Sequence, residues 1–308
     1  MLSRAITLIE SSLPQHQSES EALITACLPL SGHAFRIGIT GVPGAGKSTF
    51  IEALGNHIIQ QGGRLAVLAI DPSSERSKGS IMGDKTRMEE LAGRPEAYIR
   101  PSPSGGTLGG VARKTRETIL LCEAAGFDTI FVETVGVGQS ETAVHSMVDF
   151  FLLIMLAGAG DELQGIKRGI MEMADALVIN KADGTNIQKA RRAQAEYANA
   201  LHLFPPSPSG WTVQVRTCSS IHQTGIEEIW QMALDYQNHV TANGFLERKR
   251  KEQSKFWMYE TLREGIFNHA FNDPGMQKEL KKHEKAIAEG KMTSFMAAVS
   301  ILNKYKSK

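Results

Sequence analysis

The stretch Gly41-Val42-Pro43-Gly44-Ala45-Gly46-Lys47-Ser48-Thr49 decides the fold of this 308-residue chain. It fits G-x-x-x-x-G-K-[ST], the pattern of the phosphate-binding loop. An apolar run at 35–40 precedes it and a run of helical character at 47–60 follows it, which is the context that the pattern requires. Glycines let successive N–H groups point at phosphate oxygens, and the start of a helix adds partial positive charge. The sequence therefore predicts a site for a nucleoside phosphate.

Two side chains of this stretch have expected roles. Lys47 is expected to reach the β- and γ-phosphates, and the Ser48 hydroxyl to hold Mg²⁺. The main chain from Gly41 to Thr49 is expected to surround the phosphates. A glycine-rich turn that merely joins a strand to a helix is the alternative, and the complete spacing with Lys-Ser in place argues against it.

The composition narrows the class of protein. A hydrophobic content of 42% in 308 residues is enough for a large α/β domain with an extension. No apolar run reaches about eighteen residues, so we expect no membrane span. The three cysteines are far apart, which predicts neither a disulfide framework nor a zinc site and favours a reducing cytoplasm. A formal net charge of +1 argues against nucleic acid as a partner.

The order of apolar runs predicts three parts. Residues 1–32 have apolar positions at helical spacing and form an N-terminal helical segment. Residues 33–240 alternate short apolar strands with longer helical runs, which is typical of a mostly parallel sheet with helices on both faces. Residues 241–308 have helical patterning only, and we interpret them as a docking or dimerisation arm whose basic residues lie on solvated helix faces. A basic surface for an acidic partner is the alternative.

Individual elements follow from the same patterns. The expected strands are 36–40, 65–70, 97–99, 129–133, 150–156, 176–180 and 212–217. In the last part, the expected helices are 245–271, 275–288 and 293–305, with Asp273-Pro274-Gly275 breaking the first from the second and Thr293 capping the third.

A second motif predicts which base is bound. Asn180-Lys181-Ala182-Asp183 follows the expected strand 176–180 and fits N-K-x-D. The carboxylate of Asp183 would accept hydrogen bonds from the ring N–H and the amino group of guanine. Adenine presents an acceptor at that ring position, so it would leave the carboxylate poorly paired. Lys181 would stack along the base and Asn180 would hold the loop together; a surface loop with these residues by coincidence is the alternative.

A third stretch lies at the end of the next strand. Thr217-Cys218-Ser219-Ser220 is placed where guanine-nucleotide switches direct a backbone N–H at the guanine carbonyl oxygen, so Cys218, Ser219 and Ser220 join the expected base site.

Acidic residues at strand ends complete the expected site. Glu133 ends the strand 129–133 and could hold Mg²⁺ through water, while Gly136 could place its N–H on the γ-phosphate. Asp71 closes the second strand and is a candidate water-positioning or Mg²⁺-binding acid, with a plain Asx turn as the alternative. Asp84 follows the glycine-rich run 78–83 and could cap a helix or reach Mg²⁺.

Together these residues resemble one family, the ArgK/MeaB-type GTPases, over most of the chain. The stretches that carry the resemblance are Gly41–Thr49, Asp71–Ser74, Gly79–Met88, Val132–Glu141, Asp161–Lys167 and Asn180–Asp183. The family has also been called a kinase or ATPase of lysine/arginine/ornithine transport.

The resemblance implies an activity and a partner. It implies a homodimeric GTPase, binding GTP or GDP with Mg²⁺, that acts as a chaperone for adenosylcobalamin-dependent methylmalonyl-CoA mutase or a related mutase. It implies that Lys47, Asp71 and Glu133 serve catalysis, and that Ser48, Asp71, Asp84 and Glu133 surround Mg²⁺. Two other functions stay open: a nickel-type metallochaperone GTPase, which would need a His-rich tract or Cys/His pair, and a phosphotransferase or ATPase of basic amino-acid transport.

Overall fold

A computed structural model of the chain describes residues 1–11, 13–70, 88–101, 108–134, 140–158 and 168–306. The described chain divides into two compact units, Met1–Ser254 and Lys255–Lys308. The domain boundaries expected at 32/33 and 240/241 stay predictions. None of the helices in the described ranges is long and apolar enough to cross a membrane.

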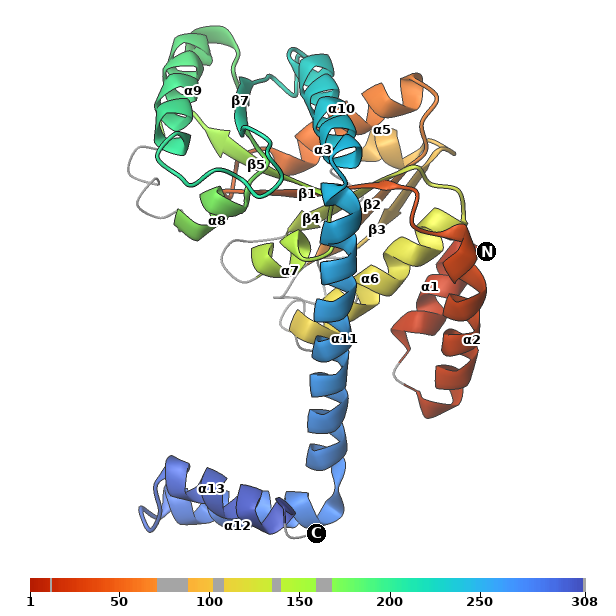
Figure 1. Cartoon of the computed structure of the whole chain (residues 1–308), viewed down its shortest axis with the longest axis vertical. Coiled ribbons are helices and arrows are strands. Elements are labelled where there is room, and N and C mark those ends of the chain that lie inside the picture. The colour runs from red at the N-terminus through yellow and green to blue at the C-terminus, as the bar shows by residue number, and fades with distance from the viewer. Residues whose placement is uncertain (12, 71–87, 102–107, 135–139, 159–167, 307–308) are drawn as a thin grey trace. The chain divides into compact units, whose positions relative to one another are not determined.

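The first unit is built on a seven-stranded sheet (Figure 1). The strand order is β3-β2-β4-β1-β5-β6-β7, and every neighbouring pair is parallel. The predicted α/β fold class is confirmed, and each expected strand is present; the largest shift is in β7, which begins at Gln214 instead of Thr212. The strands are β1 (Phe35–Gly41), β2 (Leu65–Ile70), β3 (Ala97–Arg100), β4 (Thr129–Thr134), β5 (Phe150–Leu156), β6 (Ala176–Asn180) and β7 (Gln214–Thr217).

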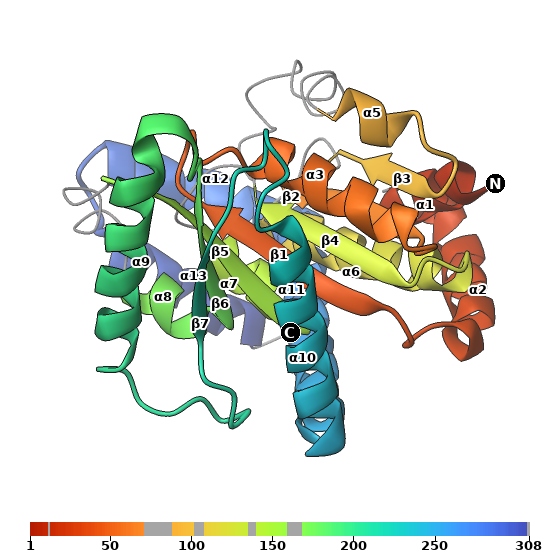
Figure 2. The ribbon, with the colours of Figure 1, turned by 90° about the horizontal axis from the view of Figure 1, so that it is seen from above.

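Helices cover both faces of the sheet (Figure 2). One face carries α3 (Lys47–Gln60), α5 (Glu89–Ala92) and α10 (Ile226–Ala242). The other carries α6 (Leu108–Ala124), α7 (Glu141–His145), α8 (Arg168–Met173) and α9 (Ile187–Leu201), and α1 (Leu2–Glu10) and α2 (Gln17–Cys27) pack against α6. Short 3-10 turns connect some elements: η1 (Pro14–His16), η2 (Leu28–Leu30) and η3 (Gly184–Asn186).

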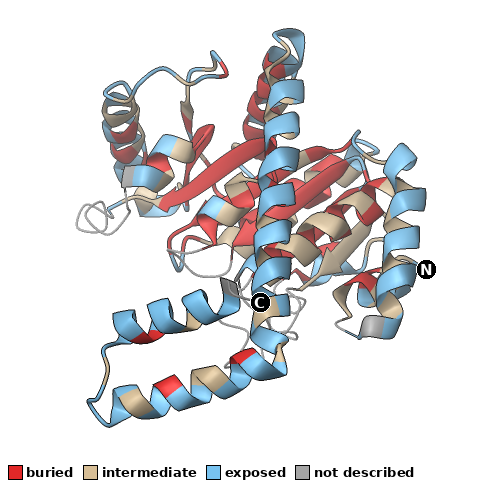
Figure 3. Ribbon diagram, turned by 60° about the horizontal axis from the view of Figure 1, so that its bottom comes forward, coloured by how far each residue is buried: buried red, intermediate tan, exposed pale blue. Residues whose placement is uncertain are grey.

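Strand β5 shows why its sequence is continuously apolar. Successive side chains of a strand point to opposite faces. Phe150 and Ile154 therefore belong to the core shared with α3 and α10, while Leu153 and Met155 belong to the core shared with α8 and α9. Figure 3 shows the central strands as buried along their length. Because all strands are parallel, the loops after β1, β4, β6 and β7 gather at one edge of the sheet, where α/β folds bind ligands.

The second unit is helical. It comprises the part of α11 (Phe245–Asn272) that follows Ser254, together with α12 (Pro274–Ala288) and α13 (Ser294–Lys306), which pack against each other. Every end of the three expected helices lies within one residue of its expected position. Asp273 caps α12 by accepting a hydrogen bond from the Met276 N–H at 2.8 Å, and the Thr293 hydroxyl accepts from the Met296 N–H at 3.2 Å.

Candidate nucleotide site

The phosphate loop joins β1 to α3 through two glycines that approach neighbouring backbone or side chains closely. A Cβ on Gly41 would lie 2.2 Å from the carbonyl oxygen of Ile154 in β5. Gly46 has φ +83° at the N-cap of α3, and a Cβ there would lie 2.9 Å from the side-chain nitrogen of Asn180. A side chain at either position would displace the loop, so the sequence pattern has a direct steric cause.

Lys47 is the first residue of α3 and lies back over the loop. Its ammonium group donates a hydrogen bond to the carbonyl oxygen of Gly41 at 3.0 Å. Burial lowers the pKa of Lys47, and the nearby carboxylates of Glu133 and Glu141 oppose that shift. Ser48 occupies the same first turn of the helix. The arrangement places one cation and the free N–H groups of the helix start at the position expected for the phosphates.

Asn180 connects the phosphate loop to the loops that are expected to bind the base. Its side chain is buried and donates to the Ala45 carbonyl oxygen at 2.8 Å. Its amide oxygen accepts from the Lys181 N–H and from the Ser220 hydroxyl, both at 2.8 Å. Burial raises the pKa of the Cys218 thiol to about 12, so this thiol stays protonated and donates to the same oxygen at 3.3 Å. One side chain therefore fixes three loops.

Asp183 is oriented by its neighbour across the base loops. The Ser219 hydroxyl donates to an Asp183 carboxylate oxygen at 2.6 Å; this uses one of about four lone-pair positions of the carboxylate, so both oxygens can still accept from a ligand. The N–H groups of Cys218 and Ser219 donate to the carbonyl oxygens of Ile179 and Thr224, each at 2.9 Å. The Ser220 N–H has a longer bond, 3.3 Å to Asn180. We therefore expect Ser220 to be the residue whose N–H can turn toward a base oxygen.

Glu133 is buried at the end of β4, beside the phosphate loop. The following Thr134 hydroxyl donates to the Thr40 hydroxyl of β1 at 2.8 Å, which ties the ends of the two strands together. A carboxylate and the Ser48 hydroxyl are the hard oxygen donors that Mg²⁺ prefers. Three other residues predicted for the site, Asp71, Asp84 and Gly136, lie outside the described residues.

A site for a softer metal such as nickel would need a cluster of nitrogen or sulfur ligands. Within the described ranges, no three His, Cys, Asp or Glu residues come together in a group that could hold a metal ion.

Sequence reasoning assigned no role to Glu141, which is buried at the start of α7 and interacts electrostatically with Lys47. It stands eight positions after Glu133, and two glycines lie between them. The spacing in the sequence does not predict that Glu141 lies near the phosphate loop, because that depends on how α7 packs in the fold.

The comparisons with known proteins agree with the site. The family model described as "Methylmalonyl Co-A mutase-associated GTPase MeaB" matches residues 2–275. This chain belongs to the MeaB family. The GTPase ArgK of Escherichia coli is 50% identical over 270 residues, covering 88% of this chain and 82% of that protein. The mitochondrial methylmalonic aciduria type A homolog of Mus musculus is 45% identical over 317 residues, covering 100% of this chain and 76% of the mouse protein.

Relatives in the MeaB family also support the activity. A probable GTPase of Mycobacterium tuberculosis is 49% identical over 98% of this chain and 90% of its own length. The crystal structure of a LAO/AO transport system kinase covers 99% of this chain and 92% of that chain, with a TM-score of 0.78 and 39% identity. The predicted resemblance to the ArgK/MeaB-type GTPases is confirmed, and the chain is a GTP hydrolase with a phosphate-binding loop.

Proposed function

We propose that this MeaB-family GTPase uses GTP hydrolysis as a conformational switch and acts as a chaperone for an adenosylcobalamin-dependent acyl-CoA mutase of the methylmalonyl-CoA type. In this role it gates loading of the cofactor and protects the mutase. Two observations support the partner: the description of the matching family model and the name of the mouse relative. The single structural observation that carries the switch is the Asn180 side chain, which bonds the phosphate loop to the base loops.

In the proposed mechanism, the residues of the phosphate loop bind and neutralise the triphosphate. The N–H groups of Gly41–Thr49 surround the phosphates, and Lys47 exchanges its bond to the Gly41 carbonyl for phosphate oxygens. Mg²⁺, when bound, neutralises charge that develops on the β- and γ-phosphates. Ser48 and Glu133, with Asp71 and Asp84, are the residues that would hold it; Asp71 would also position the attacking water.

The base site selects guanine in this proposal. Asp183, held by Ser219, accepts from the ring N–H and the amino group of guanine. Lys181 stacks along the base; its side chain already passes 3.8 Å from the Cβ position at Gly46. Gly136 would report the presence of the γ-phosphate to the residues that follow it. Base recognition and phosphate sensing then act on one connected set of loops.

We also propose that the chain is a homodimer through its second unit. This unit exposes apolar side chains that a monomer would leave in water. On α13 they recur at helical spacing, with Phe295 76%, Val299 40% and Leu302 55% exposed. On α11 the rings of Phe267 and Phe271 stack at 4.0 Å and are exposed too. A second copy of the chain is the simplest partner that covers both surfaces. The cytoplasmic location stays a prediction.

One set of measurements tests the activity and the partner. The chain should bind GDP far more tightly than ADP, release the γ-phosphate of GTP as inorganic phosphate, and change its turnover when a cobalamin-dependent mutase is added. The solved relative is named a kinase, so γ-labelled GTP should also be followed into protein. Label that accumulates on a protein would favour a phosphotransferase. Equal turnover with and without the mutase would contradict the chaperone.

The dimer has an independent test. Sedimentation of the full chain should give twice the mass expected for one copy, and Phe295→Glu with Leu302→Glu should shift it toward the monomer while GDP affinity is kept. A wild-type chain that sediments as a monomer at micromolar concentration would contradict the dimer and leave the nucleotide site untouched.

A further inference from the structure

Helix α7 reaches the nucleotide edge of the sheet with its first residue. Glu141 is 2% exposed and interacts electrostatically with Lys47 of the phosphate loop. The preceding Ser140 is also buried, and its carbonyl oxygen accepts from the Val144 N–H at 2.9 Å. A small rotation of α7 would therefore move a buried carboxylate relative to the lysine that is expected to contact the phosphates.

The body of α7 lies directly on β1, the strand that leads into the phosphate loop. A Cβ on Gly38 would lie 2.9 Å from a methyl carbon of Val144 and 2.9 Å from one of Val148. Both valines are fully buried. Because Gly38 has no side chain, α7 and the residues after it pack directly against the backbone of β1. No space is left for α7 to shift toward β1.

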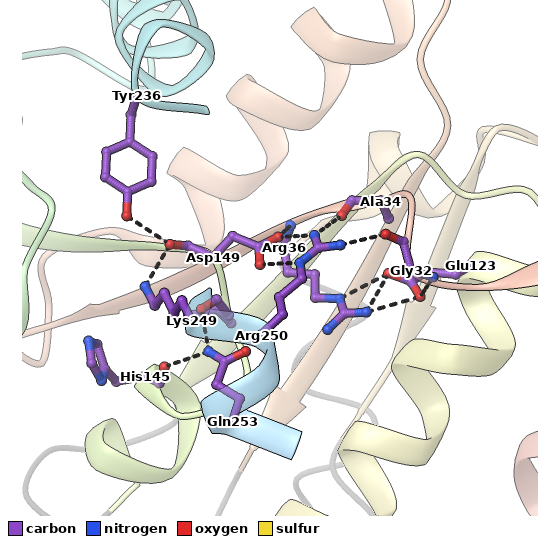
Figure 4. Close-up of polar contacts among 11 residues, drawn as sticks. Gly32, Ala34, Arg36, Glu123, His145, Asp149, Tyr236, Lys249, Arg250 and Gln253 are labelled. Carbon is purple, nitrogen blue, oxygen red and sulfur yellow. Dashed lines mark hydrogen bonds and ion pairs between the residues drawn. The ribbon is translucent and has the colours of Figure 1, made fainter. Parts of the chain in front are cut away.

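Gln253 of α11 holds the other end of α7. Its side-chain nitrogen donates to the Val148 carbonyl oxygen at 2.8 Å and to the His145 carbonyl oxygen at 3.5 Å. Gln253 is 9% exposed, so these contacts are shielded from water. Figure 4 shows Gln253 reaching from α11 toward His145, beside Lys249 and Arg250.

Neighbouring residues fix this part of α11 to the sheet. Arg250 donates to an Asp149 carboxylate oxygen at 2.8 Å and to the Ala34 carbonyl oxygen at 2.7 Å, and Lys249 donates to the Asp149 carbonyl oxygen at 2.7 Å (Figure 4). The Asp149 side chain is fully buried, and the Arg36 N–H donates to it at 2.9 Å. Asp149 directly follows Val148. The turns of α11 around Gln253 are therefore a rigid reference against which α7 is placed.

We propose that Gln253 is a positioning residue for GTP hydrolysis: it fixes α7 against α11, and α7 in turn fixes the buried Glu141 at the nucleotide edge of the sheet. The proposal needs only the GTPase activity, so it is independent of the identity of the mutase. In this proposal α11 is connected to the nucleotide site through α7 and not along a strand of the sheet.

The first test compares two neighbouring residues of α11 in the full-length chain. Gln253→Met keeps the length of the side chain and removes its donor. Ser254→Ala is the matched control, because Ser254 accepts from Arg116 of α6 at 3.3 Å and leaves α7 alone. We expect Gln253→Met to lower kcat for GTP by about threefold to tenfold, the usual effect of one lost hydrogen bond, with a smaller change in KM. Ser254→Ala should keep both within about twofold of wild type.

The second test asks whether Gln253 acts through Glu141. If it does, the double variant Gln253→Met/Glu141→Gln should lose less kcat relative to wild type than the product of the two single fold-losses. A merely structural Gln253 would lower the melting temperature and leave kcat of the folded protein unchanged. Unchanged kcat in Gln253→Met, or strictly multiplicative effects in the double variant, would overturn the proposal.

A third measurement needs no variant and applies even where Gln253→Met fails to fold. Hydrogen exchange of the wild-type chain should change in 145–148 when GDP is replaced by a non-hydrolysable GTP analogue, while exchange in 249–254 should stay the same. Exchange in 145–148 that is identical in the two states would overturn the proposal.

Discussion

Replacing Asn180 by alanine tests whether one side chain holds the nucleotide site together. The substitution removes the bond to the Ala45 carbonyl oxygen and the acceptor shared by Lys181 and Ser220. Because these bonds join the base loops to the phosphate loop, we expect the loops to lose their fixed separation. Affinity for GDP should therefore fall together with stability.

The structure sets the size of the effect. The Ala45 carbonyl is buried, so losing its donor should cost about 1–3 kcal/mol. Lys181 is exposed and its N–H can turn to water, and the Ser220 hydroxyl can find another acceptor, so these two should add only about 1 kcal/mol between them. The sum is about 2–4 kcal/mol, divided between the free energy of unfolding and the free energy of GDP binding. A loss of about tenfold to a hundredfold in GDP affinity follows.

The assay is calorimetric titration with GDP beside urea unfolding. Asn186→Ala is the matched control: the Asn186 amide donates to the Lys181 carbonyl oxygen at 2.6 Å, in the same loop, but lies on the exposed side. It should change both free energies by less than about 0.5 kcal/mol. If Asn180→Ala bound GDP within threefold of wild type, the two loops would not depend on Asn180 and the reasoning would be refuted.

Four further outcomes follow from the same structure. Asp183→Ala should weaken GDP binding by about a hundredfold or more and leave ADP binding unchanged, which calorimetry with both nucleotides measures. Lys47→Met should lower kcat for GTP by at least about a hundredfold, measured as phosphate release, because it removes the cation that faces the transferred group. Asp149→Asn should lower the free energy of unfolding by about 3–5 kcal/mol in urea, since Arg250, 20% exposed, loses the carboxylate that it pairs with and keeps the neutral Ala34 carbonyl as an acceptor; a loss under about 1 kcal/mol would contradict this. Burial and Lys249 lower the pKa of His145 from 6.5 to about 4, so the unfolded chain binds a proton before the folded one as the pH falls. The contribution of His145 to stability should be constant above pH 6.5 and decline by up to about 3 kcal/mol toward pH 4. Unfolding experiments on His145→Phe should show a decline that is smaller by this amount.

The sheet was predictable because its signals are local. A strand such as 150–156 is recognised by a continuous apolar run, and the helix start at Lys47 follows from the glycines before it. The same holds for the ends of α12 and α13, since Asp273 and Thr293 cap helices through residues three positions away. These signals depend only on residues that are close together in the sequence, so they can be interpreted without knowledge of distant contacts.

Contacts between distant residues were not predictable from the sequence. Lys249 and Arg250 lie in a strongly charged stretch, and we expected the basic residues of this stretch to be solvated. For these two the expectation is wrong: their side chains are 12% and 20% exposed, and they pair with Asp175 and Asp149 at the starts of two strands. A charged helix face has the same sequence pattern whether it meets water or a buried carboxylate far away in the chain. Only the packing of α11 against the sheet decides between the two.

The candidate site divides in the same way. The motifs at Gly41–Thr49 and Asn180–Asp183 identify the two halves of the site, but no pattern indicates that the Asn180 side chain would bond to Ala45. That bond exists because β1 and β6 both neighbour β5 and their loops leave the sheet at the same edge. The position of Glu141 near Lys47 likewise depends on how α7 packs in the fold, which no sequence pattern indicates.

Two polar clusters of the first unit lie at opposite ends of the strands that the structure describes. Lys47 and Asn180 are at the carboxyl ends, whereas Arg36 and Asp149 are at the amino ends of β1 and β5. The length of a seven-residue strand separates these ends by roughly 20 Å. A central strand paired on both sides, such as β1, cannot slide without breaking its ladder of hydrogen bonds. Helix α7 lies outside this ladder; it starts at Glu141 and leads to the carbonyl groups that Gln253 binds, so it connects the nucleotide edge of the sheet with α11.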